Sequence, residues 1–535
     1  MSKTPTLLLT GAFKPFAVDN IYSRKESIPE LFHNQITHFQ GIYSPRIHYP
    51  TYGLHLIAAN VPADVTVLDF PTWPRFIAEI KKGYDYVGIG SIIPNFYKVK
   101  RMAEAVREHA PKSRIIIGGF CAMLPDLART VEVDHVCVGE GIGFVRELLG
   151  FSRDFTFVHP DVGNRTIQVL GIPINSYLPC LVTALGCNRG CDFCSTTHFF
   201  GQKHHILLDT GEDVFREMVR LERRYKTVAM GLVGDDNFFA HVSRARQLRD
   251  LMVKHEKPYS YGTFGSADAL LQFEPKQIAE MGVDTLWIGR ESKFQPYAKN
   301  ADADMKSLVE GLGQWGVRVI LSSILLLDCH TPENIKEEID DHIAARPAFS
   351  QFAHLSPVPG TPLYERLQKE QRILDGIPYE ECHAFRQPWF FHPRFSLHQA
   401  EKIQRDAYLK EFYELGPGLA RLIHTTLRGY LSFKGSGSPP LEKRAGLIEK
   451  RMWFYKSALY DMELLAPDAK LRGVIQDIRK DVERMVGRLT AFEKSVAMAA
   501  FTVGAARRAS NGVFGDVLQP ETTYHRYPAD WKRDQ

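Results

Sequence analysis

Residues 187–194 have the sequence Cys-Asn-Arg-Gly-Cys-Asp-Phe-Cys, which places three thiols within eight positions. Cys187, Cys191 and Cys194 are separated by three and then two residues, and Asn188 and Gly190 favour turns. A loop this short can wrap three thiolates around one corner of an iron–sulfur cluster, but it cannot easily supply a fourth. Because such clusters ordinarily have four thiolate ligands, three would leave one iron open. An open metal position is typical of a reactive site rather than a structural one.

Two other interpretations of this cysteine loop are open from the residues alone. A zinc knuckle would need a fourth ligand, which His198 or Cys180 could provide. Alternatively, the three cysteines could be buried in a core without binding a metal. The sequence that follows the loop favours the cluster over both, at several points described below.

The overall composition is that of a soluble globular protein with more than one domain. The chain has 535 residues, 44% of them apolar and 24% charged, and this length predicts two to four domains. The net charge of +4 comes from 66 basic and 62 acidic residues, a near balance that does not indicate a nucleic-acid partner. Eight cysteines in so long a chain do not form a disulfide scaffold. The five outside the loop are scattered: Cys121, Cys137, Cys180, Cys329 and Cys382.

Neither end of the chain nor its interior predicts export or a membrane span. Residues 1–10 have a short leucine run without a small-residue cleavage site, so we expect no signal peptide. No stretch of about 18 uninterrupted apolar residues occurs. A reducing cytoplasm suits both free thiols and an oxygen-sensitive cluster, so we expect a cytoplasmic protein.

The first part of the chain, residues 1–155, alternates apolar strands with helices. A helix between the third and fourth strands has Val99, Met102 and Val106 on one face. Continuous apolar strands that end in glycine predict a parallel, doubly wound, Rossmann-like sheet, with ligands at the carboxyl ends of the strands. The expected strands are residues 6–10, 65–70, 86–91, 114–119 and 135–141.

The middle of the chain, residues 176–395, predicts a second βα series. Residues 151–175 before it contain Pro160, Gly163 and Pro173, which interrupt any periodicity and predict a connector. Six strands separated by helices predict a partial (β/α)6 barrel of the TIM type, with its active residues on the loops after the strands. The expected strands are residues 181–183, 227–233, 259–263, 285–292, 317–324 and 352–357.

Residues 396–535 predict an α-helical C-terminal domain with a flexible break at residues 435–440. Apolar residues from Ile478 to Val503 recur at four-three spacing, which predicts one packing seam. Residues 421–460 have an excess of basic residues beside Trp453, Phe454 and Tyr455. This stretch is either a solvated helix face or a contact with an anionic membrane surface or a lipid-like substrate.

The cysteine loop resembles the signature of the radical S-adenosylmethionine (SAM) enzymes. The resemblance implies that Cys187, Cys191 and Cys194 bind a [4Fe-4S] cluster and that Phe193 lies near the adenine of SAM. In this family, the reduced cluster cleaves SAM to a 5′-deoxyadenosyl radical. An external electron donor of the flavodoxin or ferredoxin type is also implied.

Four later strand ends match the radical SAM pattern to different degrees. The resemblance implies that Asp235 belongs to the acidic turn after the second barrel strand, that Glu291 contacts SAM, and that Pro357 lies in the proline-rich loop of residues 355–364. Ser322 lies in the fifth strand, where many relatives have glycines, so the match is weaker there. Each has a simpler interpretation: Asn237 could cap a helix, Glu291 could pair with Arg290 or Lys293, and residues 359–362 could be only a turn.

The N-terminal part resembles the cobalamin-binding domain that precedes the barrel in a large radical SAM subfamily. The resemblance rests on residues 50–54, 87–91, 117–119 and 138–141, and it implies that Ser91, Gly118, Gly119, Gly139 and Glu140 contact cobalamin. Gly118 and Gly119 would allow a close backbone approach. The chain has no Asp-x-His-x-x-Gly motif, so no histidine is assigned to cobalt. The alternative is a domain that has kept the fold and lost the cofactor.

These features lead to three functional hypotheses. The first is a cobalamin-dependent radical SAM C-methyltransferase acting on an unactivated carbon. The second is a radical SAM cyclase, or another enzyme that forms or rearranges carbon–carbon bonds, with or without cobalamin. The third is a non-catalytic protein that holds zinc or passes on a cluster. The expected substrate is a large, apolar small molecule or lipid. We expect no nucleic-acid partner, and a membrane only as a possible peripheral contact.

Overall fold

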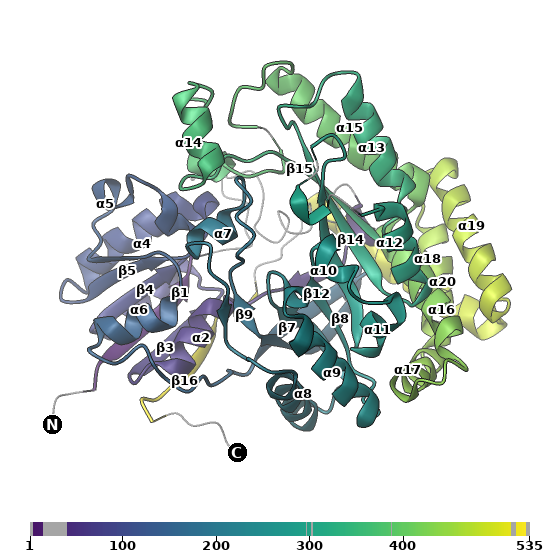
Figure 1. The fold of residues 1–535 in the computed structure, drawn as a ribbon, viewed down its shortest axis with the longest axis horizontal. Helices are drawn as coiled ribbons and strands as arrows, with labels where there is room; N and C mark the ends of the chain where they lie inside the picture. Colours follow the sequence, from purple (N-terminus) through teal and green to yellow (C-terminus); the bar gives the residue numbers. More distant parts are fainter. Residues whose placement is uncertain are drawn as a thin grey trace.

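A parallel five-stranded sheet forms the core of the N-terminal part, as the sequence predicts. The computed structural model describes residues 4–13, 40–295, 297–300, 303–386, 388–514 and 520–530. Strand order is β3-β1-β4-β5-β6, a doubly wound order that reverses between β1 and β4 (Figure 1). Ligands bind such sheets at the carboxyl ends of the strands beside the reversal. The strands are β1 (Thr6–Gly11), β3 (Asp64–Asp69), β4 (Tyr86–Gly90), β5 (Arg114–Gly118) and β6 (His135–Cys137).

Helices cover both faces of this sheet, which explains why its strands are apolar along their whole length. Phe76 and Val99 pack on one face, whereas Leu54 and Val145 pack on the other. The covering helices are α2 (Tyr52–Asn60), α3 (Trp73–Ile80), α4 (Phe96–His109), α5 (Leu127–Thr130) and α6 (Gly141–Leu148). The helix expected around Val99, Met102 and Val106 is α4.

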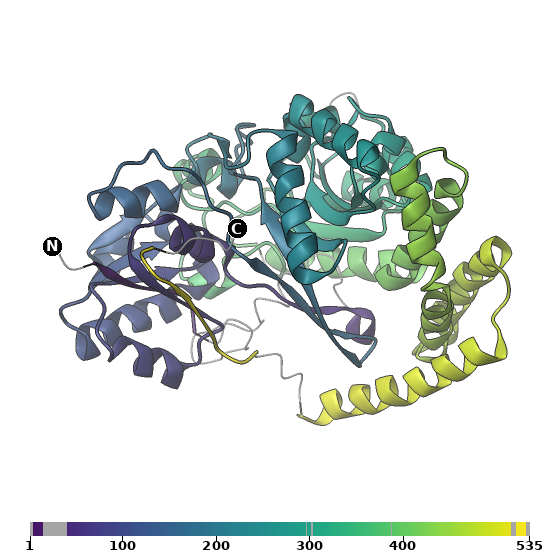
Figure 2. The same ribbon diagram turned by 90° about the horizontal axis from the view of Figure 1, so that it is seen from below.

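A sixth strand, from the far end of the chain, closes one edge of the N-terminal sheet. β16 (Thr523–Tyr527) pairs antiparallel with β3, and Figure 2 shows this C-terminal segment beside the N-terminal strands. The prediction that residues 396–535 form a helical domain is therefore wrong for its last strand. The physical reason is that β3 would otherwise present unpaired backbone groups at an exposed edge.

The six barrel strands are all present and parallel, so the partial barrel is confirmed. They form a curled sheet in the order β15-β14-β13-β12-β11-β8 (Figure 1). The strands are β8 (Ile172–Val182), β11 (Ala229–Gly234), β12 (Ser260–Phe264), β13 (Val283–Glu291), β14 (Arg318–Leu325) and β15 (Phe349–His354). The helices between and after them are α7 (Ser195–Phe199), α8 (Gly211–Tyr225), α9 (Val242–Lys254), α10 (Ala267–Leu270), α11 (Pro275–Glu280), α12 (Met305–Gln314), α13 (Asn334–Ala344) and α14 (Pro362–Lys369).

The second half of the expected connector at residues 151–175 is instead part of the barrel sheet. β7 (Val162–Val169) and the long β8 form an antiparallel hairpin, and β2 (Arg46–His48) pairs with β7 at the sheet edge. Leu170 and Gly171 make the turn, with φ values of 52° and 77°. A two-residue turn with both φ values positive matches the twist of a hairpin. The prolines and glycines thus obscured a strand pattern.

Beyond the barrel, the residues that the structure describes form six helices. They are α15 (Leu397–Leu415), α16 (Gly418–Phe433), α17 (Pro439–Glu449), α18 (Met452–Leu464), α19 (Ala469–Val486) and α20 (Ala491–Phe514). The break expected at residues 435–440 separates α16 from α17. The seam expected from Ile478 to Val503 is not continuous, because Gly487, with φ of 89°, ends α19 and the chain turns before α20. α20 runs along the lower edge of the molecule in Figure 2. Within the described residues, no helix is both long and apolar enough to cross a bilayer.

Candidate active site

The cysteine loop lies between the first barrel strand and α7, and its backbone is held by hydrogen bonds to α7. Thr197 Oγ1 donates to the carbonyl oxygen of Cys187 at 2.6 Å and accepts from the backbone N–H of Gly190 at 3.3 Å. The ring Nε2 of His198 lies 3.1 Å from the carbonyl oxygen of Cys191. The loop is therefore shaped by side chains that immediately follow it in sequence.

The spacing of the three thiols does not fit a single zinc ion. Sulfur atoms that share one tetrahedral zinc lie about 3.8 Å apart. In the described part of the chain, the one group of metal-binding side chains whose ligand atoms all lie within 4.8 Å of one another does not include these cysteines. The proposed fourth ligands are also engaged elsewhere, His198 with Cys191 and the buried Cys180 with Tyr52. The described loop therefore does not bring its three thiols to one point, as a single zinc ion would require.

Burial keeps the thiols of the loop protonated in the absence of a metal. It raises the pKa of Cys187, Cys191 and Cys194, and for Cys191 the value is about 11. The ammonium group of Lys299 opposes this at Cys191 and Cys194. Because iron binds the thiolate form, loading of this loop must release protons, and the cation beside it makes that release easier.

A buried ion pair between Glu291 and Lys299 lies beside the thiols. Glu291 Oε1 is 2.5 Å from Lys299 Nζ. Burial lowers the pKa of Lys299, but the Glu291 carboxylate outweighs this and raises it. The alternative partners considered for Glu291 bind elsewhere, Arg290 to Glu338 and Lys293 to Glu337. Sequence reasoning missed Lys299, because no motif marks a lysine that reaches back across a loop.

The backbone at the end of β13 is adapted to place the Glu291 carboxylate. Glu291 has φ of 61°, a left-handed conformation that costs energy for a residue with a side chain. A Cβ atom on Gly289 would lie only 2.3 Å from Glu291 Oε1 and 3.1 Å from Lys299 Nζ. Gly289 therefore leaves room for the ion pair. Such strain, held by surrounding structure, is characteristic of functional sites.

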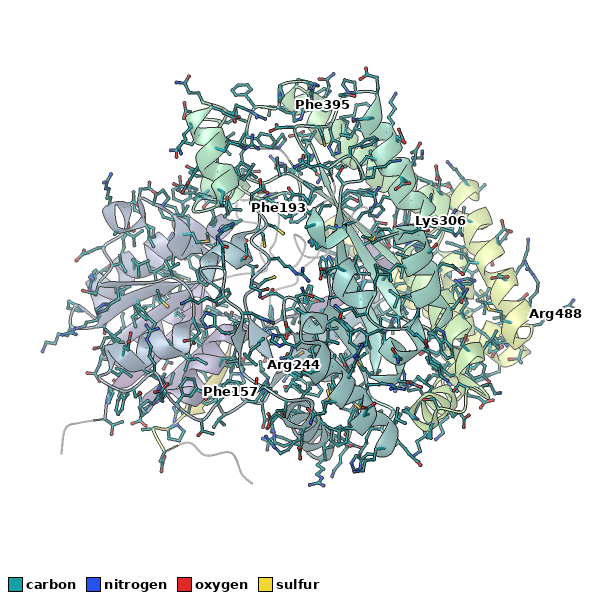
Figure 3. The ribbon with its side chains drawn as sticks, in the orientation of Figure 1. Phe157, Phe193, Arg244, Lys306, Phe395 and Arg488 are labelled. Carbon is teal, nitrogen blue, oxygen red and sulfur yellow. The ribbon has the colours of Figure 1, made fainter. Side chains whose placement is uncertain are left out.

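A cavity of about 590 Å³, the barrel cavity, opens at the carboxyl ends of β13, β14 and β15. Of the predicted site residues, Phe193, Cys194, Glu291 and Ser322 line it. The ring of Phe193 packs edge-on against Tyr297, with ring centres 5.1 Å apart. Figure 3 shows Phe193 in the middle of the molecule, between the two α/β sheets. The remaining wall is mostly apolar and aromatic, and it includes Ile92, Phe120, Trp287, Ile324, Val358 and Phe385.

Four of the residues predicted for the barrel site are absent from the described wall of the barrel cavity: Cys187, Cys191, Asp235 and Pro357. Pro357 is absent from its wall, although its neighbours Ser356 and Val358 contribute. Ser322 lines the cavity, but its hydroxyl is bound by Trp287 Nε1 and by the amide oxygen of Gln351. Asp235 is buried away from this wall.

Asp235 forms a buried polar network inside the barrel. Its carboxylate accepts from His204 at 2.9 Å, Arg244 at 2.5 Å and Thr183 at 3.1 Å. Burial raises its pKa, but His204 and Arg244 outweigh this and lower it to about 2. Arg244 lies low in the barrel in Figure 3, well below Phe193. The neighbouring Asp236, which accepts from the backbone of Gly186 at 2.9 Å, is the acid that contacts the start of the cysteine loop.

A second cavity of about 500 Å³, the sheet cavity, lies at the carboxyl ends of the N-terminal strands. Its wall is mainly apolar and contains all five residues predicted for this domain: Ser91, Gly118, Gly119, Gly139 and Glu140. The Oγ atom of Ser91 is buried there without a hydrogen-bond partner. A buried hydroxyl without a partner is costly unless a ligand satisfies it. No histidine is among the described residues of this wall.

Gly119 and Glu140 also have structural roles in the wall of the sheet cavity. Gly119 has φ of 74°, and a Cβ on it would lie 2.4 Å from the carbonyl oxygen of Ser91. Its missing side chain thus lets the β4 and β5 loops pack together. The Glu140 carboxylate caps α6, accepting from the backbone N–H groups of Ile142 and Gly143. Both residues shape the cavity rather than offer a free polar group to it.

The two cavities adjoin. Ile92 and Phe120 line both of them. Phe199, near the end of the short helix that follows Cys194, lines the sheet cavity and packs edge-on against Phe120 at 5.2 Å. A ligand held in the sheet cavity would therefore lie close to one held in the barrel cavity.

Comparisons with known proteins give relatives of one kind. No protein-family model matches the chain. It is 25% identical over 373 residues to bacteriochlorophyllide d C-12(1)-methyltransferase of Chlorobaculum tepidum, spanning 64% of this chain and 79% of the relative. It is 25% identical over 205 residues to hopanoid C-2 methylase of Rhodopseudomonas palustris, spanning 35% of this chain and 37% of the relative.

The fold is also that of a solved structure. The radical S-adenosylmethionine methyltransferase TsrM from Kitasatospora setae, with cobalamin and a [4Fe-4S] cluster bound, aligns with a TM-score of 0.51 at 13% identity. The alignment covers 84% of this chain and all of that one. This likeness supports the arrangement of a Rossmann-like domain, a partial barrel and further elements in one chain.

Proposed function

We propose that this chain, a member of the radical SAM superfamily and of its subfamily with an N-terminal cobalamin-binding-type domain, methylates an unactivated carbon of an apolar small molecule. The observation that carries the proposal is the adjacency of the sheet cavity and the barrel cavity, which share Ile92 and Phe120. The two curated relatives described above are named as methylating enzymes, which favours methyl transfer over cyclisation or coupling.

The residues present fit three cofactors. A [4Fe-4S] cluster would be held by Cys187, Cys191 and Cys194. SAM would bind the open iron of this cluster, surrounded by Phe193, Glu291 and Lys299. Ser91, Gly118, Gly119, Gly139 and Glu140 would form the wall against cobalamin. When bound, cluster and SAM supply removal of a hydrogen atom from carbon, and cobalamin supplies a methyl group.

The chain's own contribution is to position the substrate and exclude water. The barrel cavity offers aromatic and aliphatic walls from Phe120, Trp287, Ile324 and Phe385 and one buried ion pair. Such a wall suits a large apolar substrate such as a lipid or a ring-containing natural product. The Glu291–Lys299 pair presents both a carboxylate and an ammonium group, which suit the amino and carboxylate groups of SAM.

Product mass after reaction with methyl-deuterated SAM tests the proposal most directly. With apolar extracts as substrate, we expect products that gain a trideuterated methyl group, together with one 5′-deoxyadenosine per product. A cyclase or coupling enzyme would form 5′-deoxyadenosine without any deuterated product. A zinc-binding or cluster-carrier protein would form neither.

Gly289→Ala is expected to weaken SAM binding without loss of the cluster. Its Cβ would displace the Glu291 carboxylate, because the available separation is 2.3 Å. Loss of one charge-assisted contact corresponds to about a tenfold to hundredfold higher Kd for SAM, measured by equilibrium dialysis under anaerobic conditions. Gly446→Ala is the matched control, because a Cβ there meets nothing within 4 Å. Equal SAM affinity in both variants would contradict the role given to Glu291.

We propose that an outer helix face on α18 and α20, which includes only the aromatic part of the basic stretch at residues 421–460, contacts an anionic membrane surface. Arg421, Arg444 and Lys456 are buried and bind inside the protein, so they add nothing to the surface charge. The outer helix face consists of exposed residues of α18 and α20: Trp453, Phe454, Phe492, Met498, Val503, Val513 and Phe514. Phe492 is 63% exposed and lies 6.2 Å from Trp453, centre to centre.

Basic residues beside the outer helix face support contact with an anionic membrane. Lys494 and Arg508 on α20 are exposed, and Arg488 points outward at the edge of the molecule in Figure 3. Aromatic side chains flanked by cations suit the interface of an anionic bilayer. Contact with a membrane would also bring the enzyme close to an apolar substrate.

The variant Trp453→Ser/Phe492→Ser is expected to lower binding to vesicles of phosphatidylcholine with about 30% phosphatidylglycerol by about tenfold or more. Flotation of the full-length protein measures this. Phe391→Ser, which removes an exposed aromatic residue outside the C-terminal helices, is the control and should bind as the wild type does. Equal binding of all three proteins, or no binding by the wild type, would refute the membrane contact.

A further inference from the structure

Two histidines and an aspartate from three distant parts of the sequence converge at the edge of the N-terminal sheet. His55 lies on α2, Asp69 ends β3, and His525 lies on β16. Among the described residues, this is the one group of three metal-binding side chains whose ligand atoms all lie within 4.8 Å of one another. Neither the cofactors proposed above nor the barrel chemistry uses it.

Two of the three separations between these ligand atoms are compatible with a shared metal ion, and all three are within 4.8 Å. His55 Nε2 lies 2.8 Å and His525 Nε2 lies 3.4 Å from the same oxygen, Asp69 Oδ2. Ligands held about 2.1 Å from a zinc ion lie about 2.9 to 3.4 Å from one another, depending on the angle. The two imidazole rings meet edge to face, with centres 4.9 Å apart. Both ring nitrogens therefore lie close to the same carboxylate oxygen.

A neighbouring tyrosine fixes the orientation of the His55 ring, and the exposed side of His525 leaves space for a fourth ligand. The second ring nitrogen of His55, Nδ1, lies 2.8 Å from the hydroxyl of Tyr527. A hydrogen bond from Nδ1–H to this oxygen would leave Nε2 free to bind a metal, which is the usual arrangement of outer contacts around a histidine ligand. His55 and Asp69 are buried, whereas His525 is 43% exposed, so a water can reach a fourth position.

We propose that His55, Asp69 and His525 bind a divalent transition metal ion, zinc by preference, that fastens β16 to the N-terminal sheet. Two imidazole nitrogens and one carboxylate oxygen form a common zinc ligand set. The ion would link a five-residue edge strand to α2 and β3. Thr51, Gly53, Phe70 and Pro71, which flank two of the ligands in sequence, line the sheet cavity. The metal therefore supports the wall of that cavity from behind.

Zinc retention by the full-length, cluster-loaded protein tests the site. The protein is passed over chelating resin under anaerobic conditions, given one equivalent of zinc chloride, desalted and analysed for zinc and iron. We expect about one zinc per chain for the wild type and at least a tenfold loss for His525→Ala, with iron unchanged. Tyr524→Ala, an exposed neighbour on the same strand without a ligand atom, should keep its zinc.

Hydrogen exchange provides a second readout that does not depend on activity. Zinc should slow amide exchange in residues 523–527 by about tenfold in the wild type and not in His525→Ala. The proposal is overturned if the wild type retains no zinc, or if His525→Ala retains as much as the wild type. It is also overturned if zinc leaves exchange of β16 unchanged. These outcomes are independent of methyl transfer, so they separate this site from the proposed function.

Discussion

Cys191→Ala is expected to abolish reductive cleavage of SAM, with 5′-deoxyadenosine formation falling by about 1,000-fold or more. The reason is that two thiolates cannot hold the cluster in this loop, and every later step depends on it. Iron per chain should fall in parallel, and the absorbance of the cluster should be lost after anaerobic reconstitution. Liquid chromatography of 5′-deoxyadenosine with a strong chemical reductant measures the effect without a known substrate.

Cys329→Ala is the matched control for this experiment. Cys329 is also a free, partly buried cysteine, but it lies outside the loop, after β14. It should retain its iron and its 5′-deoxyadenosine formation within about twofold. If Cys191→Ala cleaved SAM as fast as Cys329→Ala, the cysteine loop would not be the site of radical formation.

Ser91→Phe is expected to abolish cobalamin binding while leaving the iron content unchanged. The Ser91 side chain lines the sheet cavity, and a phenyl ring there would occupy the space that the corrin needs. We expect cobalamin per chain to fall from about one to below about 0.1, and product methylation to fall with it. Formation of 5′-deoxyadenosine should continue, because the cysteine loop is intact. Absorption spectra of the desalted protein measure cobalamin content.

The variant Ser91→Ala distinguishes the effect of filling the sheet cavity from the effect of losing the Ser91 hydroxyl. It removes the buried hydroxyl that has no protein partner but leaves the space open. One lost hydrogen bond corresponds to about a fivefold weaker binding of cobalamin. Full cobalamin content in Ser91→Phe would mean that the sheet cavity is not the cobalamin site.

The sequence predicts both α/β sheets because local signals agree with the tertiary structure there. The barrel strands after β8 are apolar runs separated by helices, so residues 285–292 and 317–324 predict β13 and β14 almost to the residue. The last strand is different, since residues 523–527 acquire a partner only through β3, hundreds of residues earlier. Turn residues likewise hid the β7–β8 hairpin. Pairings of this kind depend on three-dimensional context rather than on local pattern.

Residues of the candidate site can be predicted from the sequence only where they belong to short, recognisable motifs. The three cysteines and Glu291 come together beside one cavity, as their resemblance to radical SAM motifs implies. Lys299 could not be predicted, because its importance depends on a loop that folds back toward Glu291. Asp235 illustrates the opposite case: its motif is recognisable, but its carboxylate binds His204 and Arg244 inside the barrel.

Anaerobic reconstitution of the full chain with iron, sulfide and cobalamin, followed by metal and cobalamin analysis of the desalted protein, tests the central claim most directly. The adjoining cavities predict about four irons and about one cobalamin per chain, bound together. Four irons without cobalamin would contradict methyl transfer and favour a cyclase or coupling enzyme. A cysteine loop that holds zinc in place of iron would contradict radical chemistry altogether.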